Sequence, residues 1–253
     1  MIDKIEICAN SFASAIAAQK GGAERIELCS VLGMGGVTPS YGLMSTVRER
    51  LNIDINILIR PREGDFLYSE YEIEEMIRDI ELCSKLKMQG VVFGALNYLS
   101  EIDIPANKKL IDAAKRNHLE TTFHRAIDLC PDVFGAMENI ISLGFNRILT
   151  SGGHQSAFEG IDTIAKMEKK AAGRIIIMAG GGINLKNARK IAFETGISEI
   201  HFSASCKKES AVAPQVRNKI ISFTPESIGG DYIYSCSDEN IITDIINSIK
   251  LKS

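Results

Sequence analysis

The stretch Lys4-Ile5-Glu6-Ile7-Cys8 places polar residues and isoleucines at alternating positions. The same alternation returns in Arg25-Ile26-Glu27-Leu28-Cys29. Alternate residues of a β-strand point to opposite faces, so each segment is predicted to be a strand with one polar face. Burying many charges is costly unless they form ion pairs or serve binding or catalysis. A polar interior shared by several strands therefore predicts a functional site. The pattern recurs in Ile59-Arg60-Pro61-Arg62, Thr122-Phe123-His124 and Ile200-His201-Phe202-Ser203.

Short β-branched runs alternate with amphipathic runs along the whole chain. Strands are predicted at 4–8, 24–29, 55–60, 90–94, 120–124, 146–150, 174–179 and 198–203. Helices are predicted at 11–20, 40–50, 70–87, 106–116, 132–142, 156–171, 184–195 and 238–250. Asn10 or Ser11 and Asn184 are the expected N-caps, and Gly21-Gly22, Gly144 and Gly196 stand where helix C-caps belong.

This order of elements predicts an α/β protein, a single-domain (β/α)8 barrel of the TIM type that spans residues 1–253. A doubly wound open sheet is the alternative, but its central strands are usually wholly apolar. Only a barrel brings the inner face of every strand to one axis. Residues 206–237 are expected to be an irregular loop region, followed by a terminal helix at 238–250.

Composition restricts the classes of partner. A net charge of −3 gives no electrostatic reason to expect nucleic acid or an anionic membrane. No apolar run approaches the roughly 18 residues of a membrane span, and the charged start does not resemble a signal peptide. The six cysteines form no CxxC pair, which favours free thiols in a reducing cytoplasm. A homo-oligomer is the expected assembly.

Barrel active sites lie at the carboxyl ends of the strands. That rule selects Arg60 and Arg62, whose guanidinium groups suit a carboxylate or phosphate. The alternative is that both arginines neutralise Glu6 and Glu27 inside the barrel. The residues expected to carry catalysis are Glu6, Glu27, Arg60, His124, Asp128 and His201.

The segment His124-Arg125-Ala126-Ile127-Asp128 follows the fifth strand. His124 is a candidate general acid or base, with Asp128 expected to orient it. His201 is a second candidate at the end of the eighth strand. For both, the alternative is a histidine that serves only the packing of the barrel.

Two glycine-rich loops could bind an anion. Gly180-Gly181-Gly182 follows the seventh strand and precedes a helix, where backbone N–H groups suit a phosphate. Tight turn geometry alone would also explain these glycines. The residues expected to bind a ligand are Arg62, Arg125, Thr150, Ser151, Gly152, Gly180, Gly181, Gly182 and Ser203.

Cys8 and Cys29 end the two matching segments Glu-Ile-Cys and Glu-Leu-Cys. Neighbouring strands lie roughly 5 Å apart, so the two thiols could meet. Soft thiolates suit Cu(I), whereas zinc is less favoured because four Cys or His ligands with metal spacing are lacking. The alternative is a pair of small buried apolar residues. The sequence shows no nucleotide-cofactor motif and no lysine on a strand end that would suit a Schiff base.

Taken together, these segments resemble the CutC family of copper homeostasis proteins over residues 2–206. The resemblance implies a cytoplasmic TIM-like barrel with a link to copper and a Cu(I) site at Cys8 and Cys29. An enzyme that acts on a small anionic or phosphorylated metabolite is the alternative function. The resemblance runs through 21–30, 36–40, 59–62, 64–69, 123–126, 149–152, 180–182 and 201–203.

Overall fold

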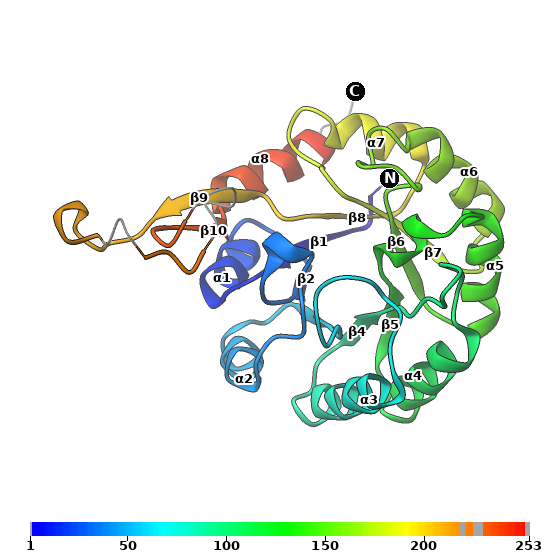
Figure 1. Cartoon of the computed structure of the whole chain (residues 1–253). Coiled ribbons are helices and arrows are strands. Elements are labelled where there is room, and N and C mark those ends of the chain that lie inside the picture. The colour runs from blue at the N-terminus through cyan, green and yellow to red at the C-terminus, as the bar shows by residue number, and fades with distance from the viewer. Residues whose placement is uncertain (1, 218–220, 225–229, 251–253) are drawn as a thin grey trace.

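Eight parallel strands close into a barrel in chain order from β1 to β8 in the computed structural model, which describes residues 2–217, 221–224 and 230–250 (Figure 1). The barrel strands are β1 Lys4–Ala9, β2 Arg25–Leu28, β3 Asp54–Leu58, β4 Gly90–Phe93, β5 Glu120–Phe123, β6 Arg147–Thr150, β7 Ile176–Gly180 and β8 Glu199–Phe202. The helices are α1 Phe12–Lys20, α2 Tyr41–Arg50, α3 Glu70–Lys85, α4 Ile104–Arg116, α5 Val133–Leu143, α6 Ile161–Ala171, α7 Ala188–Thr195 and α8 Glu239–Lys250.

The predicted (β/α)8 barrel is confirmed, and closure between β1 and β8 excludes the open doubly wound sheet. Strand register aligns the polar positions: Glu6 is the partner of Arg25 on β2 and of His201 on β8. Ile5 and Ile7 lie on the other face of β1 and are buried in the main hydrophobic core. The alternation of residues along each strand therefore separates an apolar layer under the helices from a polar lumen.

Most helix ends follow the local sequence signals. Ser11 caps α1, because its side chain accepts a hydrogen bond from the Ser14 N–H. Gly144 ends α5 in the left-handed conformation, which costs glycine little because it has no Cβ. Ser69 and Glu72 form a reciprocal capping box at the start of α3.

Two helices begin later than their periodicity predicts. α6 begins at Ile161 rather than near 156, because Gly160 packs directly on the loop after β6. A Cβ on Gly160 would lie 1.9 Å from the Ser151 carbonyl oxygen. α7 is preceded by Asn187, not by the expected Asn184, whose side chain accepts from the Lys186 N–H in the preceding turn.

An antiparallel two-stranded sheet, β9 Ser205–Glu209 with β10 Ile233–Ser237, stands where an irregular loop was expected (Figure 1). We call this projection the arm. Its base is tied to α1, because the Ser237 N–H donates to Ser14 Oγ. The chain then returns to the barrel in α8, where Ile242, Ile245 and Ile246 are buried. In the part of the chain that the structure describes, no helix has the length and apolarity needed to span a membrane.

Candidate functional site

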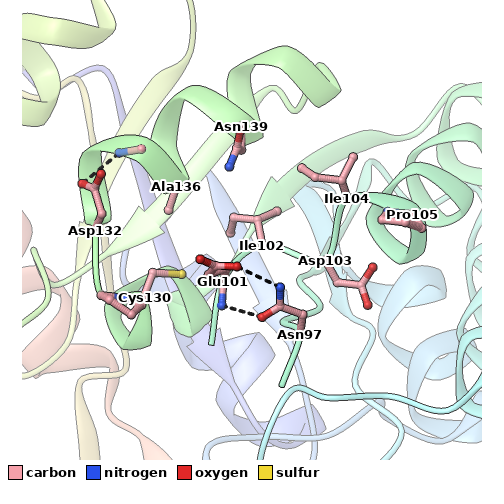
Figure 2. A pocket seen from close by; sticks show the side chains of 12 residues that line it. Asn97, Glu101, Ile102, Asp103, Ile104, Pro105, Cys130, Asp132, Ala136 and Asn139 are labelled. Atoms are coloured by element: carbon pink, nitrogen blue, oxygen red, sulfur yellow. Dashed lines mark hydrogen bonds between the residues drawn. The ribbon is translucent and has the colours of Figure 1, made fainter. Parts of the chain in front are cut away.

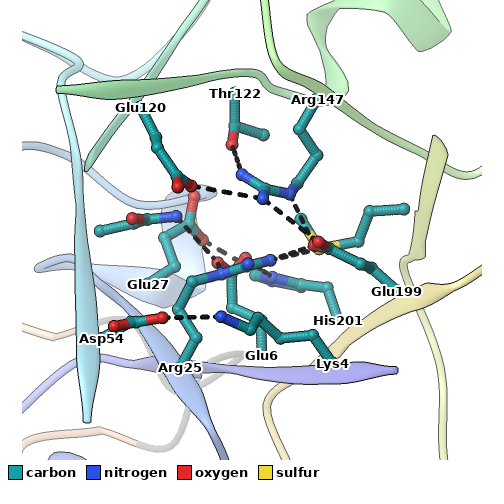
Figure 3. Close-up of polar contacts among 12 residues, drawn as sticks. Lys4, Glu6, Arg25, Glu27, Asp54, Glu120, Thr122, Arg147, Glu199 and His201 are labelled. Atoms are coloured by element: carbon teal, nitrogen blue, oxygen red, sulfur yellow. Dashed lines mark hydrogen bonds and ion pairs between the residues drawn. The ribbon is translucent and has the colours of Figure 1, made fainter. Parts of the chain in front are cut away.

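The lower lumen holds a balanced network of buried ions (Figure 3). Arg25 forms ion pairs with Glu6 and Glu199, and Arg147 Nε lies 2.6 Å from Glu199 Oε2. Burial alone would raise the pKa of Glu6, but Arg25, His201 and Arg147 together hold that pKa far below its usual range. Glu6 is therefore a carboxylate whose charge Arg25 neutralises, and both arginines pair with Glu199.

Glu27 and His201 lie at the top of this network. His201 Nδ1 is 2.8 Å from Glu6 Oε1, and His201 Nε2 is 3.6 Å from Glu27 Oε2. Burial raises the pKa of Glu27, and the attraction of His201 offsets this only in part. Burial would lower the pKa of His201, but its bond to Glu6 and the charges of both carboxylates raise it. This pair can therefore exchange a proton with a bound ligand.

Cys8 and Cys29 meet just above this pair, as their strand positions predicted. Their sulfur atoms are 3.8 Å apart, and Leu58 and Val92 pack around them. The contact with Cys29, burial and the charge of Glu27 all raise the pKa of the Cys8 thiol. Without a metal, Cys8 is accordingly a thiol in a partly apolar site.

A pocket of about 310 Å³ opens above these groups at the carboxyl ends of the strands. It unites Glu27, Arg60, His124 and His201, which come from four different strand ends. This position is where barrels of this type place their active sites. The full lining is Cys8, Glu27, Cys29, Leu32, Gly35, Leu58, Arg60, Phe66, His124, Arg125, Leu149, Gly181, Gly182, Ile183, His201, Phe202 and Ser203.

Arg60 serves the walls of the pocket rather than the lumen carboxylates. Its Nη atoms donate to the carbonyl oxygens of Met34, Gly36 and Gly64 at 2.7–3.1 Å, which ties two loops together. The alternative that Arg60 and Arg62 neutralise Glu6 and Glu27 is therefore wrong. Arg62 pairs with Asp65 and Glu72 at the outer rim and does not line the pocket.

His124 is buried beside Arg60, and burial together with that charge lowers its pKa to about 3. Its Nδ1 accepts a hydrogen bond from the Ala126 N–H at 3.3 Å, and its Nε2 has no partner among the described residues. The expectation that Asp128 orients His124 is wrong, since Asp128 contacts other groups. His124 is a neutral imidazole at neutral pH and a candidate hydrogen-bonding group for a ligand.

Asp128 follows β5, and its carboxylate reaches the loop after β6. It accepts from Thr150 Oγ1, from the N–H groups of Ser151 and Gly153, from Ser151 Oγ and from Arg125 Nε. An internal carboxylate thus takes the donors of Thr150 and Ser151 that the sequence assigned to a ligand, and the Gly152 N–H donates to Thr150 Oγ1. This arrangement fixes the position of Arg125 at the pocket wall.

Free donors remain in the loop after β7. Among the described residues, none accepts a hydrogen bond from the N–H groups of Gly181, Gly182 or Ile183. All three residues line the pocket, and a Cβ on Gly181 would lie 3.0 Å from the Arg125 guanidinium. Ser203, at the end of β8, lines the same wall. Arg125 and these amides form a wall that suits an anion.

A larger hollow of about 630 Å³ is lined by other residues, from the loop before α4 and the start of α5 (Figure 2). Its polar groups already serve local structure, because Asp103 caps α4 and Asp132 caps α5. Glu101 accepts from Asn97 Nδ2 at 3.1 Å. It holds no buried titratable pair comparable to Glu27 and His201, so we place the candidate site in the smaller pocket.

Three lumen residues escaped the sequence analysis as site residues: Asn56, Arg147 and Glu199. Each occupies a strand position whose side chain points into the lumen, so the alternation that selected Glu6 and Glu27 could have selected them. Arg147 and Glu199 stand at the start of β6 and β8, inside the predicted strands 146–150 and 198–203. The structure shows that they complete the network around Glu6.

Comparison with known proteins agrees with this architecture. The CutC family profile matches residues 3–206. The chain belongs to the CutC family. A CutC family protein of Parabacteroides distasonis is 53% identical over 201 residues, 79% of this chain and 82% of that protein. One of Bacteroides thetaiotaomicron is 45% identical over 250 residues, 98% of this chain and 97% of that protein.

The crystal structure of CutC from Streptococcus agalactiae, described as a candidate copper homeostasis protein, superposes with a TM-score of 0.76 at 34% identity. It covers 80% of this chain and 99% of that one. All the pocket residues, from Cys8 to Ser203, lie inside the CutC match, whereas most of the arm and α8 follow it. The candidate site is therefore part of the shared CutC barrel.

Proposed function

We propose that this CutC chain handles copper in the cytoplasm and binds Cu(I) through Cys8 and Cys29. The observation that carries the proposal is the 3.8 Å separation of the two sulfur atoms at the floor of the mouth pocket. Metal–thiolate bonds of about 2.3 Å, as in zinc sites, would let sulfurs up to roughly 4.6 Å apart share one ion. The two side chains can thus reach a common ion without large movement.

The surroundings of the two thiols fit a soft monovalent ion. Leu58 and Val92 give a partly apolar shell, and Cys29 is fully buried. Soft thiolate ligands select Cu(I) over hard cations. Binding would release the thiol protons, because the thiolate is the form that binds a metal. Glu27 beside Cys8 opposes this ionisation, so affinity should rise with pH.

Titration of the reduced protein with Cu(I) against a competing chelator tests the proposal. The background should lack Cys206 and Cys236, since this second pair, on the arm, has the same 3.8 Å sulfur spacing. In that background, Cys8→Ser with Cys29→Ser should abolish stoichiometric Cu(I) binding. Cys130→Ser, outside the lumen, is the control and should leave binding intact. Unchanged affinity in the double variant would remove copper from these residues.

An enzyme that acts on a small anionic metabolite is the second candidate. The observation that favours it is the wall of unbonded N–H groups at Gly181, Gly182 and Ile183 beside Arg125. Glu27 and His201 lie in the same pocket and could transfer a proton. A copper site alone gives no reason for an anion-binding wall.

Binding of inorganic phosphate and of small phosphorylated metabolites, measured by calorimetry, tests this second candidate. Arg125→Gln should weaken binding by about 1.5–3 kcal/mol, the range for hydrogen bonds to charged groups. Arg62→Gln is the matched control, because Arg62 bonds Asp65 and Glu72 outside the pocket. Equal weakening by both variants would show that the anions bind by general surface charge.

A further inference from the structure

We propose that Cys8, Glu27 and His201 form a three-ligand site for a divalent cation of the zinc class, with an open coordination position toward the mouth pocket. The site shares Cys8 with the proposed Cu(I) pair but does not use Cys29. It deepens the second candidate function, because it supplies a metal beside the anion-binding wall. A bound ion would hold one oxygen of a water or a substrate in the pocket.

The three ligand atoms already converge. The Cys8 sulfur, a Glu27 oxygen and a His201 nitrogen all lie within 4.8 Å of one another, and all three residues are buried. Strand register produces this arrangement, since Cys8 is the partner of Glu27 on β2 and Glu6 is the partner of His201 on β8. Zinc binds such sulfur, nitrogen and oxygen donors at about 2.0–2.3 Å, so small side-chain rotations would close the set.

Glu6 orients the His201 ring and sets which of its nitrogens carries the proton. Arg25 and the Asn56 amide both donate to Glu6 Oε2, and His201 Nδ1 faces Oε1 at 2.8 Å. A carboxylate held by these donors can only accept, so Nδ1 carries the proton and Nε2 presents its lone pair toward Glu27 and Cys8. Metal-binding histidines usually donate their other N–H to a carboxylate in this way.

Glu27 is the lumen carboxylate that lacks an arginine. Glu6 and Glu199 pair with Arg25, and Arg147 also serves Glu199, whereas His201 at 3.6 Å is the partner of Glu27 among the described residues. A divalent cation with the Glu27 carboxylate and the Cys8 thiolate makes a neutral unit. The Cys8 S–H proton, and any proton held between Glu27 and His201, would leave to solvent as the metal–ligand bonds form, so the charges balance in the buried site.

The open position follows from the pocket. Catalytic zinc sites keep three protein ligands and leave the fourth position for water or substrate. The pocket of about 310 Å³ borders all three ligands and extends to Arg125 and the Gly181–Ile183 amides. An anionic substrate bound to that wall would place an oxygen near the ion. A set of four Cys or His ligands with metal spacing, which the sequence lacks, is needed only for a closed structural site.

Co(II) titration of the reduced full-length protein tests the proposal, because a thiolate–Co(II) charge-transfer band and intense d–d bands report a tetrahedral site with sulfur. We expect both bands in the wild type and competition by Zn(II). Loss of a residue that hydrogen-bonds to a metal ligand lowers metal affinity about 10–100-fold. Loss of a ligand itself should cost more, so Glu27→Gln and His201→Gln should each lower Co(II) affinity by at least about 100-fold. His154→Gln removes an exposed histidine and is the matched control.

Cys29→Ser separates this site from the copper proposal. It should leave the Co(II) spectrum and affinity intact while, in the background without Cys206 and Cys236, it abolishes stoichiometric Cu(I) binding. If Co(II) binding also requires Cys29, the ion belongs to the thiol pair and the three-ligand site is overturned. Absence of a thiolate–Co(II) band in the wild type overturns it as well. Zn(II) protection of Cys8 against alkylation in the wild type gives a measurement that does not depend on whether the variants fold.

Discussion

At the scale of single residues, His124 makes the fold sensitive to acid. Burial and Arg60 lower its pKa to about 3 in the folded protein, whereas an unfolded histidine has a pKa near 6.5. Between these values the unfolded chain binds a proton that the folded protein does not. The free energy of unfolding should therefore fall as pH drops below about 6.5, by up to roughly 1.4 kcal/mol per pH unit.

His124→Asn should remove this part of the pH dependence, because an asparagine oxygen can still accept from the Ala126 N–H without titrating. Urea unfolding at about pH 7 and about pH 5 gives the measurement, and the variant should lose about 2 kcal/mol less than the wild type. Other groups titrate equally in both proteins, so the comparison isolates His124. An identical loss in both would mean that His124 is protonated in the folded state.

The spacing of residues along the sequence did not predict the hydrogen-bond partners of Asp128. Asp128 follows His124 by one helical turn, which suggested a pair, yet its carboxylate bonds Thr150, Ser151 and Gly153. The loop after β6 folds back toward the loop after β5. Its hydrogen-bond donors are distant from Asp128 in the sequence, yet they bind its carboxylate in place of His124. Local spacing could not reveal this contact, because it depends on how neighbouring βα loops pack.

At the scale of elements, caps and periodicity located most helices within a residue or two. The exceptions are α6 and α7, whose starts depend on contacts with other parts of the barrel. The residue before α6 is a glycine, and a Cβ there would meet the Ser151 carbonyl oxygen. The Ala157 N–H donates to the Gly181 carbonyl oxygen. These contacts join the loop after β6 to the loop after β7, which lines the pocket.

The arm is the element that periodicity did not indicate. Its strands are short and largely exposed, so they lack the alternation of apolar and polar residues that marks a half-buried strand. Their register is defined by pairing, with Cys206 opposite Cys236, and by the bonds of Asn10 and Ser14 to β10. Such long-range contacts are absent from any local window of sequence.

At the scale of the whole molecule, the barrel depends on the buried ions as well as on the apolar layer. Arg25 is almost fully buried between Glu6 and Glu199. Arg25→Leu would leave these carboxylates facing each other with much less neutralising charge. Removing one partner of a buried pair typically costs about 3–5 kcal/mol, so this variant should lose that much stability in urea unfolding.

Lys4→Gln is the matched control for Arg25→Leu. Lys4 also pairs across the strands, with Asp54 at 2.7 Å, but both side chains are about one-third exposed. Exposed pairs contribute up to about 1 kcal/mol, so the loss should be small. Similar losses of unfolding free energy in the two variants would contradict the prediction that the buried ion pairs of the lumen matter more for stability than an exposed pair.

The sequence by itself determined the barrel, its polar lumen and the meeting of Cys8 with Cys29. Strand alternation has a fixed period of two, so parity assigns each side chain to a face without knowledge of the rest of the molecule. Closure then brings every inward position to one axis. The same reasoning could have included Arg147 and Glu199.

Tertiary structure alone decided the partners within the site. The register between neighbouring strands decides which inward-pointing residues lie at the same height along the barrel axis. It places Glu6 beside Arg25 and His201 rather than beside Arg60. Loop packing gives donors after β6 to Asp128, whereas the Gly181, Gly182 and Ile183 N–H groups after β7 have no acceptor among the described residues. Charges act over a few ångströms in the folded protein, so the balance that leaves Glu27 without an arginine exists only once the barrel has closed.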